Sequence, residues 1–231
     1  MVHNRQHIAT DWDAVRKVTG APATKVNECQ DEAEKRWKTS SFQKYLYGLA
    51  KLMPLEKHTG VVVETGTGIS TEVLRQGLER PVIVYDDAGE KQVATLPFVL
   101  CSVDSEEKDY PLGVKFVKGT SDSALSRIAM EHPIWDIFIH DSEHDVFTQT
   151  FEMEFAWRVL RPGGLLVINA YTWDEHGAFE QFLIRKKQKF WSAGGAGLIR
   201  KPSTVQSTLD WSLAWTRAVD IATATRTSTE G

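Results

Sequence analysis

The densest group of side chains able to do chemistry lies at residues 140 to 145, with the sequence HDSEHD. It directly follows WDIFI, a mostly apolar segment whose composition predicts a buried strand. Histidine titrates near neutral pH, so His140 and His144 are candidates for a general base, with Asp141 as a third. A structural alternative is that His140 forms ordinary hydrogen bonds at the strand end. The first interpretation predicts proton abstraction at a strand tip.

A second chemical signal is the glycine turn at residues 61 to 71, VVVETGTGIST. Its three valines predict a strand buried on both faces, and Gly66 and Gly68 permit backbone conformations and close ligand approach that side chains prevent. The dinucleotide fingerprint needs a third glycine where this chain has Thr71, and the Lys-Ser/Thr ending of a phosphate loop is missing. Glu64 at the strand tip would repel a pyrophosphate and attract a cation. The turn therefore predicts a site for a cationic cofactor, the alternative being a plain link between strand and helix.

The glycine turn resembles motif I of the class I S-adenosylmethionine (SAM) dependent methyltransferases, in which an acidic-x-Gly-x-Gly sequence cradles the cofactor. A second stretch, VLRPGGLLVIN, is similar to the Leu-x-Pro-Gly-Gly turn that introduces the fifth strand in that family. The resemblance covers roughly residues 60 to 202. It implies SAM as cofactor, S-adenosylhomocysteine (SAH) as product, and contacts to the amino acid end of SAM from Glu64, Gly66, Thr67, Gly68 and Ser70. Asp141 is expected to be a further cofactor-binding residue.

The segment IHDSEHDVF resembles the IDGxHxY signature of a group of bacterial small-molecule O-methyltransferases. The match places Asp141 on the acid of the signature and His144 on its histidine, which makes His144 the first candidate for the base. Two departures are Ser142 in place of the glycine and Phe147 near, rather than at, the tyrosine. The implied reaction is in-line methyl transfer to a small-molecule oxygen, with nitrogen acceptors left open.

The elements that must position these residues follow the order of a Rossmann-like, doubly wound α/β fold, with helices on both faces of a mostly parallel sheet. KFWSAGGAGLIRKP predicts an antiparallel C-terminal hairpin strand pair. We expect residues 1–58 to form an N-terminal helical lid or cap, residues 59–202 the SAM-binding domain, and residues 203–231 a polar tail with a short helix at 211–222. A helical stripe covers residues 31 to 52, while the chain before it suits a helix or a loop.

Two acids compete for the ribose hydroxyls of the cofactor, which the tip of the second parallel strand binds. Asp86 follows one strand candidate, at 82–85, and Asp104 follows a more apolar one, at 98–103. We favour Asp104, because the chain then leads directly into the next strand, although Asp86 has the expected spacing of 20 residues from Gly66.

The turn before the next helix supplies the expected adenine contacts. In the family, the turn after the third strand lies against the adenine, which implies contacts from Thr120, Ser121 and Asp122. The alternative is that Ser121 or Asp122 is a simple helix cap.

The residues that end the fifth strand indicate whether the protein binds a catalytic metal. Related enzymes place an Asp-Asp or Asp-Asn pair there to hold a divalent ion with the fourth-strand acid, and this chain has Asn169 and Ala170. Magnesium prefers carboxylates, so we predict no catalytic metal. A transition-metal site formed by His140, Asp141, His144 and His176 is the alternative.

Composition limits the remaining functions. The 231 residues hold 27 basic and 31 acidic side chains, a net charge of −4, without the long basic run that nucleic acid binding requires. The two cysteines favour a reducing compartment over a disulfide framework, and no apolar run is long enough to span a membrane. We expect a cytoplasmic protein whose partner is a small-molecule substrate, compatible with a homodimer.

Two other functions compete with methyl transfer. A SAM-binding protein used for other chemistry, or a noncatalytic interaction subunit, would also show the substituted strand-four signature and the altered strand-five site. A nicotinamide-dependent oxidoreductase would need the missing third glycine and tolerates Glu64 poorly.

Overall fold

A computed structural model describes residues 7–38, 40–54, 60–79, 81–85, 91–95, 98–171 and 177–203. The strands are β1 His7–Thr10, β2 Gly60–Thr65, β3 Pro81–Tyr85, β4 Lys91–Thr95, β5 Phe98–Asp104, β6 Val114–Lys118, β7 Trp135–His140, β8 Leu160–Ile168, β9 Phe190–Ala193 and β10 Ala196–Arg200. The helices are α1 Asp11–Thr19, α2 Ala23–Arg36, α3 Ser41–Leu52, α4 Ile69–Leu78, α5 Ser121–Glu131, α6 Val146–Val159 and α7 Ala178–Lys186.

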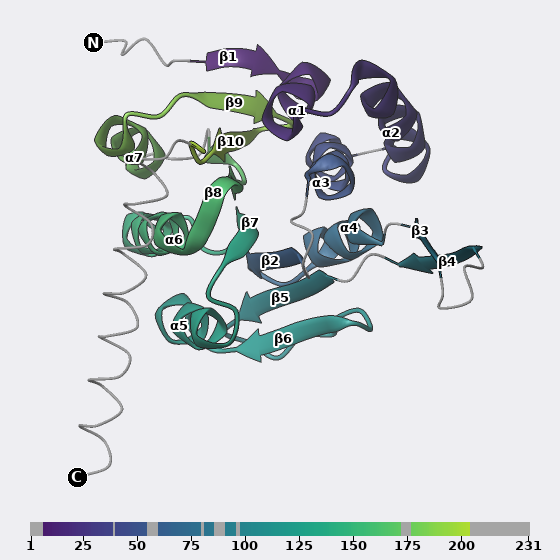
Figure 1. The fold of residues 1–231 in the computed structure, drawn as a ribbon. Helices are drawn as coiled ribbons and strands as arrows, with labels where there is room; N and C mark the ends of the chain where they lie inside the picture. The colour runs from purple at the N-terminus through teal and green to yellow at the C-terminus, as the bar shows by residue number, and fades with distance from the viewer. Residues whose placement is uncertain are drawn as a thin grey trace.

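In the described part of the chain, the strands form one eight-stranded sheet and a separate hairpin of β3 and β4. The order across the large sheet is β1-β9-β10-β8-β7-β2-β5-β6. The strands from β8 to β6 run parallel, and β10 pairs antiparallel with both β8 and β9 (Figure 1). The predicted mostly parallel sheet with an antiparallel C-terminal hairpin is therefore confirmed. Strand β1, parallel to β9, extends it further than we predicted.

Helices cover both faces of the sheet. On one face lie α1, α3 and α4, with α2 packed outside against α3, and on the other lie α5, α6 and α7 (Figure 1). Strand β2 contributes to both cores, because Val62 belongs to the cluster on the α3 and α4 side, whereas Val61 and Val63 belong to the other. The run of β-branched residues thus forms a strand buried on both faces, as predicted.

The chain builds the sheet outward from β2 in two directions. Strands β5 and β6 follow on one side of β2, and β7 and β8 follow on the other. Between β2 and β7 the strand order reverses, because the chain continues from β2 to β5 on one side and from β7 to β8 on the other. An open α/β sheet binds its ligand at such a point, outside the carboxyl ends of the strands. The topology therefore brings the glycine turn and the HDSEHD segment to one edge.

Several local predictions differ from the structure. The stripe over residues 31 to 52 forms two helices rather than one, because Ser40 starts α3 by accepting a hydrogen bond from the backbone N of Gln43 (3.3 Å). The chain before residue 31 holds β1, α1 and most of α2. The strand candidate at 82–85 pairs with β4 outside the large sheet, so β5 is the second parallel strand, beside β2.

Helix α6 does not bury all of its phenylalanines. Phe147 is 84% exposed and Phe151 is 37% exposed, whereas Gln149, Glu152 and Met153 are buried. The helix therefore turns polar side chains inward, toward the edge of the sheet where β7 ends.

Some expectations fall beyond the described residues: the rival acid Asp86, the histidine His176 and the tail helix. The division at residue 58 stays a prediction, although residues of α1, α3 and α4 belong to one core. Within the described ranges, no helix has the length and apolar character to cross a membrane.

Candidate functional site

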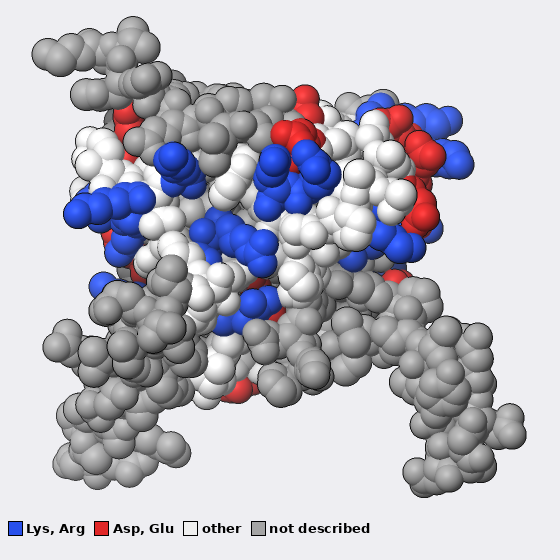
Figure 2. All heavy atoms as spheres, turned by 45° about the horizontal axis from the view of Figure 1, so that its top comes forward, with Lys and Arg blue, Asp and Glu red and all other residues white. Residues whose placement is uncertain are grey.

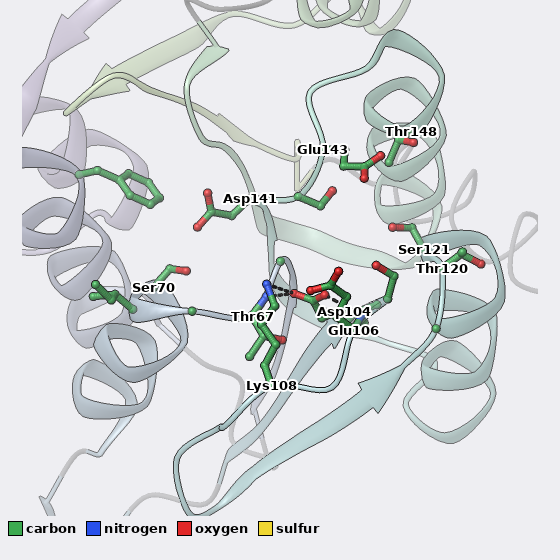
Figure 3. Close-up of a pocket in the computed structure, with 18 of the residues that line it drawn as sticks. Thr67, Ser70, Asp104, Glu106, Lys108, Thr120, Ser121, Asp141, Glu143 and Thr148 are labelled. Atoms are coloured by element: carbon green, nitrogen blue, oxygen red, sulfur yellow. Dashed lines mark hydrogen bonds and ion pairs between the residues drawn. The ribbon is translucent and has the colours of Figure 1, made fainter.

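A cavity of about 830 Å³ opens at the carboxyl edge of the parallel strands (Figure 3). Its walls come from the turns after β2, β5, β6 and β7 and from the start of α3. The lining residues are Ser40, Phe42, Gln43, Gly66, Thr67, Gly68, Ile69, Ser70, Val103, Asp104, Ser105, Glu106, Lys108, Gly119, Thr120, Ser121, Asp141, Ser142, Glu143 and Thr148. This volume lies within the range of small-molecule sites.

The two glycines of the turn after β2 have different roles. A Cβ atom on Gly66 would lie 2.1 Å from the carbonyl oxygen of Asp141, and φ at Gly66 is +86°. A Cβ atom on Gly68 would meet no described atom within 4 Å, and Gly68 lines the cavity. Gly66 therefore lets the turn contact the loop after β7, whereas Gly68 leaves room for a ligand.

Glu64 lies beneath this turn, and it is not among the cavity-lining residues. Its buried Oε2 accepts hydrogen bonds from Thr71 Oγ1 (2.6 Å) and Ser102 Oγ (3.1 Å), while Oε1 has no partner among the described residues. Burial raises the pKa of Glu64 to about 8, although neighbouring hydroxyls favour the charged form. Thr71 Oγ1 also accepts a hydrogen bond from Gly68 N (3.1 Å), so Glu64 supports the turn from below.

Asp104 ends β5 and lies on the cavity wall (Figure 3). Its Oδ2 accepts a hydrogen bond from Thr67 N (3.1 Å) and pairs with Lys108 Nζ (3.2 Å), and its Oδ1 accepts one from Glu106 N (3.0 Å). Burial pushes the pKa of Asp104 upward, but these partners outweigh it and the net shift is downward. Asp104 is therefore a carboxylate at neutral pH, fixed between two turns.

The turn between β6 and α5 brings two of its three predicted residues to the cavity. Thr120 and Ser121 line the wall, whereas Asp122 is exposed and is not among the lining residues. The Thr120 hydroxyl donates to Asp122 Oδ1. The Ser121 hydroxyl donates to Glu152 Oε1, which holds the start of α5 against α6.

Of the three predicted catalytic residues at the tip of β7, one lines the cavity and two do not. Asp141 lines the cavity; burial raises its pKa, against a hydrogen bond from Asn169 Nδ2 to its Oδ1. His140 is fully buried, with Nδ1 2.7 Å from Glu152 Oε2. The ring of His144 lies 5.4 Å from that of His140, and desolvation together with His140 lowers its pKa. Neither histidine is a lining residue, so Asp141 is the candidate base that faces the cavity.

The donor set at this tip is poor for a hard metal ion. Asn169 gives its amide N–H to Asp141, which leaves one carboxylate where magnesium would want several oxygen ligands. Within the described ranges, no three His, Cys, Asp or Glu side chains are grouped to hold a metal. The alternative site with His176 extends beyond them.

Sequence reasoning missed two parts of the site. One is the set of individual wall residues Ser40, Phe42 and Gln43, which lie within the expected N-terminal lid, together with Ile69, which is 65% exposed. The other is Glu152, which no local signal distinguishes from the neighbouring acid Glu154 in the same helix.

The charge on the cavity wall is mainly negative. Four acids, Asp104, Glu106, Asp141 and Glu143, face one cation, Lys108. By contrast, on the face of the molecule shown in Figure 2, lysines and arginines are more prominent than acidic side chains. A wall with this balance attracts a sulfonium or ammonium group and repels a pyrophosphate. The open space at Gly68 and the acid at the tip of β5 also fit SAM.

Comparisons with known proteins identify the fold. No family model matches the sequence, and no curated protein matches it. The TDP-rhamnose 3'-O-methyltransferase CalS11 of calicheamicin biosynthesis matches 82% of this chain and 92% of its own, with a TM-score of 0.51 and 14% identity. A protein from Corynebacterium glutamicum matches 82% of this chain and 95% of its own, with a TM-score of 0.49 and 15% identity.

A larger enzyme also matches in part. MycE, a methyltransferase from the mycinamycin biosynthetic pathway solved with Mg and SAH, matches 63% of this chain with a TM-score of 0.45 and 16% identity. The match covers 45% of MycE, so this chain spans about half its length. The sheet order and the match to CalS11 together show that this chain has a Rossmann-like α/β fold, which it shares with that O-methyltransferase.

Proposed function

We propose that this protein is an enzyme that transfers a methyl group from SAM to an oxygen of a small-molecule acceptor. The observation that carries the proposal is the acidic cavity at the carboxyl edge of the sheet, where four carboxylates and a single lysine surround space for a cationic cofactor. SAM would supply an activated methyl group on its sulfonium. CalS11, which shares the fold, is by name an O-methyltransferase.

The cofactor would lie across the turns after β2, β5 and β6. Thr67, Gly68 and Ser70 would hold its amino acid end, with Glu64 and Gly66 supporting that turn from beneath. Asp104 would accept hydrogen bonds from the ribose hydroxyls, in exchange for its contact with Lys108. Thr120 and Ser121, with Asp122 beside them, would border the adenine.

The acceptor would approach from the side of the β7 loop. Holding acceptor and methyl donor in line can contribute about 7 to 11 kcal/mol to catalysis. Asp141 lines the cavity and His144 lies in the same loop, so either could take the proton of an acceptor hydroxyl, and His140 supports the loop from the core. We propose that no metal is essential, because Asn169 occupies Asp141 with an amide N–H.

The test is calorimetric titration of chelator-treated protein with SAM, SAH and NAD. Micromolar binding of SAM or SAH, and turnover of alcohol or phenol acceptors without added metal, are the expected results. Binding of NAD instead, or of none of the three, would refute the proposal.

A noncatalytic SAM-binding protein is the second candidate function. It is favoured by one observation, that neither His140 nor His144 is among the cavity-lining residues. Tight SAH binding without methyl transfer to any tested acceptor would support it over the first.

A further inference from the structure

Glu152 is an acid buried in the middle of α6, with no exposed side-chain surface. Burying a carboxylate is costly unless hydrogen bonds replace those it made to water. The groups that provide these bonds therefore indicate what the residue does.

Four donors converge on its two oxygens. Thr65 Oγ1 donates to Oε2 (2.6 Å), and His140 Nδ1 lies 2.7 Å from the same oxygen. Ser142 Oγ donates to Oε1 (2.8 Å), and so does Ser121 Oγ. The donors come from the ends of β2 and β7, the loop after β7 and the first residue of α5. One carboxylate thus joins three segments that surround the cavity.

These partners keep Glu152 ionised. Burial favours its neutral form, but the hydrogen bond and charge of His140 and the hydroxyls of Ser121 and Thr65 outweigh burial, and the pKa is lowered. An ionised carboxylate can only accept hydrogen bonds, so each partner must be the hydrogen-bond donor. His140 therefore carries a proton on Nδ1.

Two of the donors, Ser121 and Ser142, also line the cavity. A hydroxyl has one proton and two lone pairs. Because both protons are directed to Glu152, the two serines present only lone pairs to the cavity. They can accept a hydrogen bond from a ligand there, and they cannot donate one.

We propose that Glu152 is a positioning residue, which fixes Ser121 and Ser142 as acceptors for N–H or O–H groups of the bound ligand. The inference rests on the proposed function, in which that ligand is SAM or SAH. It also accounts for Ser142, which stands where the resembled signature has glycine, since its hydroxyl lies 2.8 Å from Glu152 Oε1.

The first variant is Glu152→Gln, which keeps the shape but gives one side of the group N–H donors. When these N–H donors face Ser121 and Ser142, at least one serine must reverse its hydroxyl and direct a proton into the cavity. We expect SAH affinity, measured by calorimetry, to fall about tenfold or more, the size of one lost hydrogen bond. The matched control is Glu154→Gln on the same helix. Glu154 pairs with Arg185 and Lys186 away from the cavity, so its substitution should leave affinity unchanged.

A double-mutant cycle separates positioning from general destabilisation. In the Ser121→Ala/Ser142→Ala background, Glu152→Gln should have little further effect on SAH affinity. An equal fold-loss in both backgrounds would overturn the proposal. If Glu152→Gln does not fold, the double variant Ser121→Ala/Ser142→Ala provides the test. Wild-type SAH affinity in that variant would overturn the inference.

The outcomes also separate this inference from the proposed function. A wild-type protein that binds neither SAM nor SAH overturns the proposed function and this inference with it. Tight wild-type binding that Glu152→Gln leaves unchanged overturns this inference alone.

Discussion

Gly66 and Asp141 meet backbone to backbone at the edge of the sheet. A Cβ atom at position 66 would lie 2.1 Å from the carbonyl oxygen of Asp141, closer than any two such atoms can approach. The preceding residue reinforces the contact, because Thr65 O accepts a hydrogen bond from Asp141 N (3.0 Å). The glycine turn and the loop that carries the candidate base are therefore locked together, and neither can shift without the other.

Gly66→Ala should consequently destabilise the fold. The new methyl group clashes with backbone rather than with a flexible side chain, and φ of +86° is unfavourable for alanine. We expect a loss of about 2 to 4 kcal/mol in the free energy of unfolding, measured by urea denaturation. Unchanged stability would show that the two loops are not locked.

Gly68→Ala is the matched control in the same turn. Its Cβ would meet no described atom within 4 Å and φ is −177°, so stability should be retained. The added methyl group would instead occupy cavity space, and SAH affinity should fall about tenfold by calorimetry. Full affinity in this variant would argue against ligand approach at Gly68.

Glu64 should make stability depend on pH. Its pKa is about 8 in the folded protein and about 4.5 when unfolded, so between these values the folded state holds a proton that the unfolded state has released. The free energy of unfolding therefore decreases as pH rises from about 5 to 8, by up to about 1.4 kcal/mol per unit. Urea denaturation across this range should show that slope in the wild type and a smaller one in Glu64→Gln. Equal slopes would mean that Glu64 is ionised throughout.

Asp104→Asn should weaken cofactor binding more than it affects the fold. The side chain keeps an oxygen for Thr67 N but loses its charge, its pairing with Lys108 and half of its accepting capacity. We expect SAH affinity to fall by about tenfold or more in calorimetric titration. Lys108→Met is the comparison: removing the competitor for Asp104 should leave affinity equal or higher.

The sequence was most informative where local pattern decides structure. Three consecutive valines predicted the doubly buried β2, and the more apolar candidate strand correctly proved to be β5, so that Asp104 ends a strand beside β2. Glu152 could not be predicted, because its partner Thr65 lies 87 residues away and only the folded sheet brings them together. Helix α6 exposes Phe147 and turns this acid inward, an arrangement that residue type alone does not predict.

We expect Asp141 to act as the base of methyl transfer. Asp141 lines the cavity and burial raises its pKa, whereas His144 is not among the lining residues. Asp141→Asn should therefore lower kcat for methyl transfer about 10²- to 10⁴-fold, and His144→Gln should lower it less. A base must be ionised to act, so the wild-type rate should fall as pH decreases through the raised pKa of Asp141, at a higher pH than an ordinary aspartate would give. The opposite result would be a larger loss of kcat in His144→Gln than in Asp141→Asn, together with an unchanged pH profile in Asp141→Asn. It would assign the proton transfer to His144, and the loop after β7 would then have to turn His144 toward the acceptor.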